Sequence, residues 1–252
     1  MRFYTLPPIK IFWPHVLINA NRPETGLAYV RTHRRDVEAI IIDSGIEIFR
    51  DPNVKDYPPG HLKRLVWLYN RVRCLCSDAE VWVTAPDYCD DYHPGALWLN
   101  ADFTNIERTV ESVKRALTEH PEVDWLIPVQ GHYREPKSVA YCISLYEQEG
   151  ILDGRDYVAV ANLCTERRHD IMVETILIAE RMLAPKRIHV FGLDVDVAAK
   201  VKQRIFSFDS LAWTFPRSPG LPSCKNSKQR RQYFLAFIKR LEELGLLNGV
   251  RW

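Results

Sequence analysis

Short runs of β-branched and aromatic residues recur along the chain, and polar positions do not alternate strictly with apolar ones inside them. Strands that are buried on both faces, as in a parallel sheet, have this continuous apolar character. An eighth strand is expected either at Phe3–Leu6 or in a segment after Asp209. The seven clearer runs predict strands at His15–Asn19, Ile40–Asp43, Val81–Pro86, Trp125–Gln130, Tyr157–Ala161, Ile188–Gly192 and Ile205–Asp209.

Helical periodicity fills the intervals between these runs. Thr104-Asn105-Ile106-Glu107 has the spacing of a capping box, in which the first and last side chains accept hydrogen bonds from each other's backbone N–H. Apolar residues at intervals of three and four predict helices over 62–72, 104–117, 139–150, 171–183 and 226–246.

Strands that alternate with helices imply a parallel sheet. Seven or eight such strands favour a closed (β/α)8 barrel of the TIM type, and an open doubly wound sheet is the alternative. The sequence contains no Gly-rich phosphate loop, no dinucleotide-binding fingerprint and no low-complexity linker. Residues 1–252 are therefore interpreted as one barrel domain.

Composition agrees with a globular barrel. The chain has 252 residues, of which 46% are apolar and 26% charged, so disorder, collagen and small disulfide scaffolds are excluded. No signal peptide and no apolar run of about 18–20 residues is present, so we expect a cytoplasmic protein with six reduced cysteines and no membrane partner. The net charge of +2 neither requires nor excludes a nucleic-acid partner.

Polar residues gather where the predicted strands end, which is the catalytic face of a parallel barrel. Any single aspartate there has an alternative role as a helix N-cap, but several carboxylates around one mouth point to acid/base chemistry. The segments at these ends are Asp43-Ser44-Gly45, Asp87–Asp91, Gln130-Gly131-His132, Asn162-Leu163-Cys164, Gly192-Leu193-Asp194 and Asp209-Ser210.

Five of these segments carry a family resemblance. Ile42-Asp43-Ser44-Gly45 resembles the Asp-Ser-Gly-Gly-Phe-Gln segment of tRNA-guanine transglycosylases, and Asp87-Tyr88-Cys89 is similar to their Asp-Glu-Cys. Val129-Gln130-Gly131 is similar to their Val-Gln-Gly. Val160–Cys164 stands where they have Val-Gly-Gly-Leu-Ala, and Phe208-Asp209-Ser210 where they have Phe-Asp-Cys. The resemblance runs from about Ile40 to Phe215.

The resemblance implies a (β/α)8 barrel that exchanges guanine in a nucleic acid for a 7-deazaguanine base. Asp209 would be the nucleophile that attacks C1′ of the sugar, and Asp43 the general acid/base. Asp87 and Cys89 would hold the N1 and N2 edge of the purine, and Gln130 its O6, because carboxylates accept hydrogen bonds and amides donate them. The other substrate-binding residues that it implies are Ser44, Gly131, Leu163 and Cys164.

The chain departs from the family pattern at the zinc ligands, and this difference bears on which nucleic acid is the acceptor. The tRNA enzymes hold a structural zinc with a Cys-x-Cys-x-x-Cys group and a later His, whereas Cys224 stands alone after Asp209. We therefore expect neither a metal nor a cofactor, and no zinc-binding subdomain. A minimal barrel of this kind is most similar to the DpdA family, which inserts 7-deazaguanines into DNA. DNA is thus the favoured acceptor. A tRNA acceptor, a hydrolytic glycosylase, an inactive partner subunit and a homodimer remain open.

Basic residues follow the expected nucleophile. In a barrel the loops after the strands share the catalytic face, so these residues predict a phosphate-binding rim, with a solvated charged surface as the alternative. A target base in a duplex would have to leave the stack to reach the mouth of the barrel. The rim residues are Arg217, Lys225, Lys228, Arg230 and Arg231.

Overall fold

The computed structural model describes residues 1–8, 10–92, 104–214 and 226–247. Eight parallel strands form one sheet in the order β1-β8-β7-β6-β5-β4-β3-β2. The strands are β1 (Arg2–Tyr4), β2 (His15–Asn19), β3 (Ala39–Asp43), β4 (Glu80–Thr84), β5 (Trp125–Val129), β6 (Tyr157–Val160), β7 (Arg187–Val190) and β8 (Ser207–Asp209).

The two edge strands of the sheet, β1 and β2, meet just after β1. Thr5 forms a parallel bridge with Val16 of β2, and the N–H of Leu17 donates to the carbonyl of Thr5 at 2.8 Å. The sheet is therefore a nearly closed barrel, and the predicted (β/α)8 fold of the TIM type is confirmed. The alternative of an open doubly wound sheet is wrong. The eighth strand is β1 at the amino-terminal end, which was one of its two expected places.

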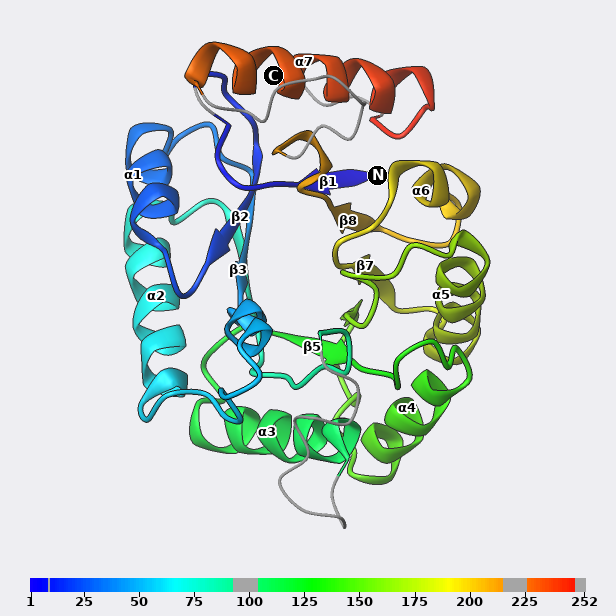
Figure 1. Cartoon of the computed structure of the whole chain (residues 1–252). Helices are drawn as coiled ribbons and strands as arrows, with labels where there is room; N and C mark the ends of the chain where they lie inside the picture. Colours follow the sequence, from blue (N-terminus) through cyan, green and yellow to red (C-terminus); the bar gives the residue numbers. More distant parts are fainter. Residues whose placement is uncertain (9, 93–103, 215–225, 248–252) are drawn as a thin grey trace.

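Helices surround the barrel (Figure 1). The five expected helices are present, with ends that differ by a few residues from the prediction, and the capping box of Thr104 and Glu107 is confirmed. Two shorter helices, α1 and α6, and two 3-10 helices were not predicted. The helices are α1 (Glu24–Thr32), α2 (His61–Leu75), α3 (Asn105–Glu119), α4 (Ser138–Gln148), α5 (His169–Leu183), α6 (Val195–Val201) and α7 (Ser227–Glu243), with η1 (Ile46–Arg50) and η2 (Ala212–Thr214).

The strands are buried on both faces, which explains why their sequences lack polar alternation. On β3, Ile40 and Ile42 belong to the large core between the sheet and the helices, whereas Ala39 and Ile41 belong to a second core inside the barrel. Side chains alternate along a strand, so neighbouring residues reach opposite cores. Within the described part of the chain, no helix combines the length and apolar character that a membrane crossing needs.

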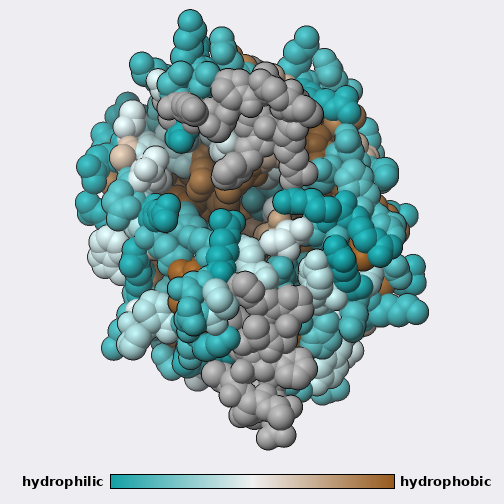
Figure 2. Space-filling model, in the orientation of Figure 1, coloured by the Kyte–Doolittle hydropathy of each residue, from teal (hydrophilic) through white to brown (hydrophobic). Residues whose placement is uncertain are grey.

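Stacked side chains fill the barrel at the amino ends of the strands. The guanidinium of Arg187 lies 4.9 Å from the ring centres of both Tyr157 and Phe206, and its Nη1 lies 3.2 Å from Glu80. This packing closes the amino end of the barrel. The polar loops gather at the other end, where the carboxyl ends of the strands lie. The face seen in Figure 1 is hollowed at its centre, where hydrophobic residues lie inside a mostly hydrophilic border (Figure 2).

Candidate active site

Asp87 connects three neighbouring strand ends. The Oγ of Ser44, just after β3, donates to Asp87 Oδ1 at 2.7 Å. Nε2 of Gln130, just after β5, donates to Asp87 Oδ2 at 2.6 Å. Burial raises the pKa of Asp87 to about 6, although both donors act in the opposite direction. Three of the residues expected to bind the base therefore form one buried hydrogen-bonded group.

Two aromatic side chains contact the backbone carbonyls of this group. The hydroxyl of Tyr57 donates to the backbone carbonyl of Asp87 at 3.0 Å, and Nε2 of His61 lies 2.8 Å from the carbonyl of Ser44. The rings of Tyr57 and His61 stack with centres 4.2 Å apart and planes 14° apart. Neither residue was predicted, because Tyr57 lies in the segment between η1 and α2 and His61 is the first residue of α2, where the sequence carries no motif.

Asp43 is the last residue of β3 and has the environment of a proton donor. Loss of solvent raises its pKa well above the usual value, and the carboxylates of Glu47, Asp87 and Asp209 raise it further. The backbone N–H of Gly45, 3.3 Å from Oδ1, acts in the opposite direction. A carboxyl group whose raised pKa favours the protonated form is suited to general acid catalysis.

Asp209 ends β8, and one of its oxygens is fixed. Oδ1 accepts the backbone N–H of Gly192 at 2.9 Å and lies 3.4 Å from Nε2 of His189. Among the described residues, the structure shows no hydrogen bond to Oδ2. The side chain is buried at the mouth, and its charge acts on Asp43 and on Cys164. Asp43, Asp87 and Asp209 therefore share one site, as expected from the sequence.

The two cysteines of the expected site are neutral thiols. Burial and the negative charges of Asp91 and Asp87 raise the pKa of Cys89 well above its usual value. Burial and the charges of Asp91, Asp209 and Asp43 do the same for the pKa of Cys164. Because the thiolate is the reactive form of cysteine, neither residue competes with Asp209 as a nucleophile. Leu163, also expected in the site, is buried in the core.

Two glycines let the loops approach one another closely. A Cβ added to Gly192 would lie 2.8 Å from the Cα of Cys164, and Gly192 also has a φ of +63°. A Cβ added to Gly131 would lie 2.6 Å from Nδ2 of Asn162. The segment after β6 therefore packs closely against the loops after β5 and β7, through the side chain of Asn162 and the backbone of Cys164.

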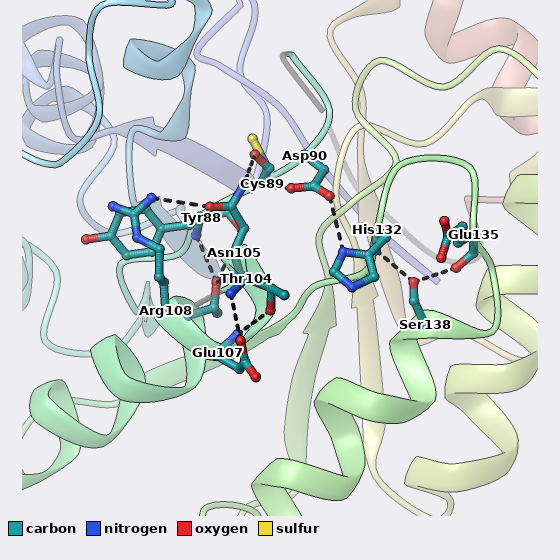
Figure 3. Close-up of polar contacts among 11 residues, drawn as sticks. Tyr88, Cys89, Asp90, Thr104, Asn105, Glu107, Arg108, His132, Glu135 and Ser138 are labelled. Carbon is teal, nitrogen blue, oxygen red and sulfur yellow. Dashed lines mark hydrogen bonds and ion pairs between the residues drawn. The ribbon is translucent and has the colours of Figure 1, made fainter. Parts of the chain in front are cut away.

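The loop after β4 is anchored to the first turn of α3 (Figure 3). Nδ2 of Asn105 donates to the carbonyl of Cys89 at 3.1 Å and to Oδ1 of Asp90 at 2.6 Å. The guanidinium of Arg108 lies 3.8 Å from the ring centre of Tyr88. On the other side of Asp90, Oδ2 lies 3.2 Å from Nδ1 of His132, which joins the loop after β5.

The expected phosphate-binding rim is described only in part. Lys228, Arg230 and Arg231 are exposed on the first turns of α7. Arg217 and Lys225 lie outside the described residues. Among the residues that the structure describes, no group of three or more His, Cys, Asp or Glu side chains is arranged to hold a metal ion.

Comparison with known proteins gives no independent assignment, because no family model matches the chain and no curated protein matches it.

Proposed function

We propose that this protein is a base-exchanging transglycosylase that replaces guanine in a nucleic acid, preferentially DNA, with a 7-deazaguanine base. The proposal rests chiefly on one observation. Asp43, Asp87 and Asp209, from the ends of β3, β4 and β8, share the mouth of the barrel, and each has a different environment. Carboxyl groups with separate environments are suited to separate roles in one reaction.

Asp209 is the nucleophile in this proposal. Its Oδ2 attacks C1′ of the sugar, the bond from C1′ to N9 breaks, and the electron pair moves to N9 of guanine. Asp43, whose raised pKa favours the protonated form, transfers its proton to the departing base. The incoming 7-deazaguanine returns a proton from its N9 to Asp43, attacks C1′ and releases Asp209. Two displacements retain the configuration at C1′.

Asp87 and Gln130 bind the purine. Ionised Asp87 accepts hydrogen bonds from N1 and N2, because each carboxylate oxygen can accept a second bond beside those from Ser44 and Gln130. The amide nitrogen of Gln130 has a second hydrogen, which is directed to O6 in this proposal. Ser44 therefore orients the carboxylate as well as lining the pocket. Cys89 supplies a neutral thiol at the same edge.

The choice of DNA comes from the resemblance of this minimal barrel to the DpdA family and from the exposed cations on α7. Cations neutralise phosphates without reading the sequence. The retention of both Asp43 and Asp209 disfavours an inactive partner subunit, which would need neither residue for catalysis. The resemblance and the geometry thus support the same reaction.

The test is an exchange assay. Wild-type protein and the variant Asp209→Asn are incubated with a radiolabelled 7-deazaguanine base and either duplex DNA or tRNA. We expect label in DNA with the wild type and none with the variant. Label in tRNA alone would identify tRNA as the acceptor instead of DNA. Guanine release without incorporation of label would identify a hydrolytic glycosylase. Wild-type protein that neither labels a polymer nor releases guanine would overturn the proposal.

A further inference from the structure

His189 lies beside Asp209 inside the wall of the barrel. In the parallel ladder between β7 and β8, His189 pairs with Ser207. Ser207 and Asp209 are two residues apart on β8, so their side chains share one face of the strand. The imidazole is fully buried and lies close to both, with Nδ1 2.8 Å from Ser207 Oγ and Nε2 3.4 Å from Asp209 Oδ1.

The contacts extend away from the mouth to a tyrosine. The hydroxyl of Tyr157, on β6, lies 2.6 Å from Ser207 Oγ. The rings of Tyr4 and Phe191 pack edge-on against the imidazole, with centres 5.6 Å and 4.5 Å away. Nε2 of His189 has no hydrogen-bond partner within the described residues, and Asp209 is the acidic group beside it. A buried nitrogen without a partner is costly, which favours a bond to this carboxylate.

Tyr157, Ser207, His189 and Asp209 thus form a row of polar contacts. The two residues at its ends, Tyr157 and Asp209, determine the direction of every hydrogen bond in it. A carboxylate only accepts, so Nε2 of His189 must carry the proton. Burial lowers the pKa of His189, so the ring is neutral and Nδ1 must accept from Ser207. Burial raises the pKa of Tyr157 well above its usual value, so its hydroxyl keeps its proton and donates to Ser207. Each group then donates one bond toward Asp209.

We propose that His189 is a positioning residue for the nucleophile: together with the N–H of Gly192 it holds Oδ1 of Asp209, so that Oδ2 is the oxygen that attacks C1′. This inference rests on the proposed function. Catalytic hydrogen bonds are often long in the absence of substrate and shorten in the reacting complex, so the distance of 3.4 Å suits this role. A neutral donor orients the carboxylate but neutralises less of its charge than a lysine or arginine would.

Three variants test the row of hydrogen bonds by steady-state kinetics of base exchange. His189→Leu removes both nitrogens, and we expect kcat to fall about tenfold or more while KM for the base changes less than about threefold. His189→Gln retains an N–H donor that can reach Asp209 and should restore part of kcat. Ser207→Ala removes the donor to Nδ1, which frees the imidazole to change tautomer, and should lower kcat by a smaller factor.

His15 supplies the matched control. It is a second buried histidine of the barrel, on β2, and its Nε2 lies 3.4 Å from an acidic side chain, the exposed Glu38. His15→Leu removes the same atoms from a similar environment without touching the site of Asp209. It should leave kcat for exchange close to the wild-type value. Equal losses in His15→Leu and His189→Leu would show that a buried imidazole only supports the fold.

Nitrogen NMR of histidine-labelled protein gives a readout that does not depend on activity. In the wild type the proton of His189 should be on Nε2, and Asp209→Asn should shift the Nε2 resonance. A proton on Nδ1, or a spectrum insensitive to Asp209→Asn, would overturn the inference. These experiments distinguish a failure of the proposed function from a failure of the positioning role of His189. Wild-type protein without exchange activity would overturn the proposed function, whereas His189→Leu with wild-type kcat would overturn only the positioning role.

Discussion

Gln130 and Asp87 are joined by a hydrogen bond of 2.6 Å between Nε2 and Oδ2, although 43 residues separate them in the chain. The bond links the carboxyl ends of β5 and β4 below the surface of the mouth. Because Ser44 occupies the other oxygen of Asp87, the carboxylate has one orientation before any ligand arrives. A binding site that is ordered in advance loses less entropy when it binds its ligand.

Replacement of Asp87 should weaken binding of the free base. In Asp87→Ala, the N1 and N2 donors of a bound guanine would be buried without acceptors, which costs about 1–3 kcal/mol or more. We expect affinity for the free base to fall about tenfold or more in titration calorimetry. Asp153→Ala, which removes an exposed carboxylate, is the control. Unchanged affinity in Asp87→Ala would place the base elsewhere.

Base binding should depend on pH through the same residue. The pKa of Asp87 is raised to about 6, and only the ionised form accepts from both N1 and N2. Affinity should therefore rise between about pH 5 and pH 7, with a midpoint near 6. Titrations at several pH values measure this directly, and Asp87→Asn should flatten the profile. A wild-type affinity that is constant over this range would contradict the role of Asp87 as an ionised acceptor.

Asp209→Asn should abolish exchange without unfolding the barrel. The side chains are nearly the same size, and an amide does not replace a carboxylate as a nucleophile toward C1′. A protein–nucleic-acid adduct that survives denaturation should form with the wild type and be absent from the variant on a denaturing gel. The melting temperatures of the two proteins should be similar. Asp153→Asn is the matched control at an exposed position, and adduct formation by Asp209→Asn would refute the assignment.

The strands could be predicted because each is an apolar run between polar ends. β1 has only three residues and was one of two alternatives, since so short a run carries little periodicity. α1 was missed because it contains Gly26 and begins after Pro23 without a side-chain cap, and α6 because it has only seven residues. The prediction of a (β/α)8 barrel was nevertheless correct: the alternation of strands and helices implies a parallel sheet, and seven or eight strands favoured a closed barrel over an open sheet.

The site was predictable only where its residues follow strands directly. Asp43, Asp87 and Asp209 stand at strand ends, and the structure brings them together. Tyr57 reaches the site from a loop and His61 from the first turn of α2, so only the folded chain reveals their contacts with Asp87 and Ser44. His189 and Ser207 offered a signal that was overlooked, a polar residue inside an otherwise apolar strand. The catalytic roles themselves remain predictions.

Asp91 should make the folded protein more stable at mildly acidic pH. Burial raises its pKa to about 7 in the folded state, whereas an exposed aspartate titrates near 4. Between these values the folded protein binds the extra proton, so this contribution is complete below about pH 4 and is lost as the pH rises through about 7. From pH 5 to pH 8 it amounts to about 2–3 kcal/mol of unfolding free energy.

Asp91→Asn should remove that contribution. Urea titrations at pH 5 and pH 8 should give a smaller difference in unfolding free energy for Asp91→Asn than for the wild type. Asp78→Asn, at an exposed turn, should behave as the wild type does. Equal pH dependence in Asp91→Asn and the wild type would mean that Asp91 titrates normally in the folded protein.

Charge reversal on α7 should separate polymer binding from base binding. Lys228, Arg230 and Arg231 are exposed, and each phosphate that they neutralise releases counterions from the nucleic acid. The triple change to Glu should weaken DNA binding and lower the slope of log affinity against log salt by about 0.9 for each phosphate that the variant no longer neutralises. Affinity for the free base should stay the same, because none of the three touches the group around Asp87. The matched control reverses three exposed cations on other helices, Arg71, Arg115 and Arg181, with the same change in net charge. If both triple variants bind DNA with equally reduced affinity, the net charge of the protein and not a rim on α7 governs binding. If neither variant is weakened, the expected rim on α7 is wrong, and DNA binding that also ignored salt would favour a small nucleoside as the acceptor.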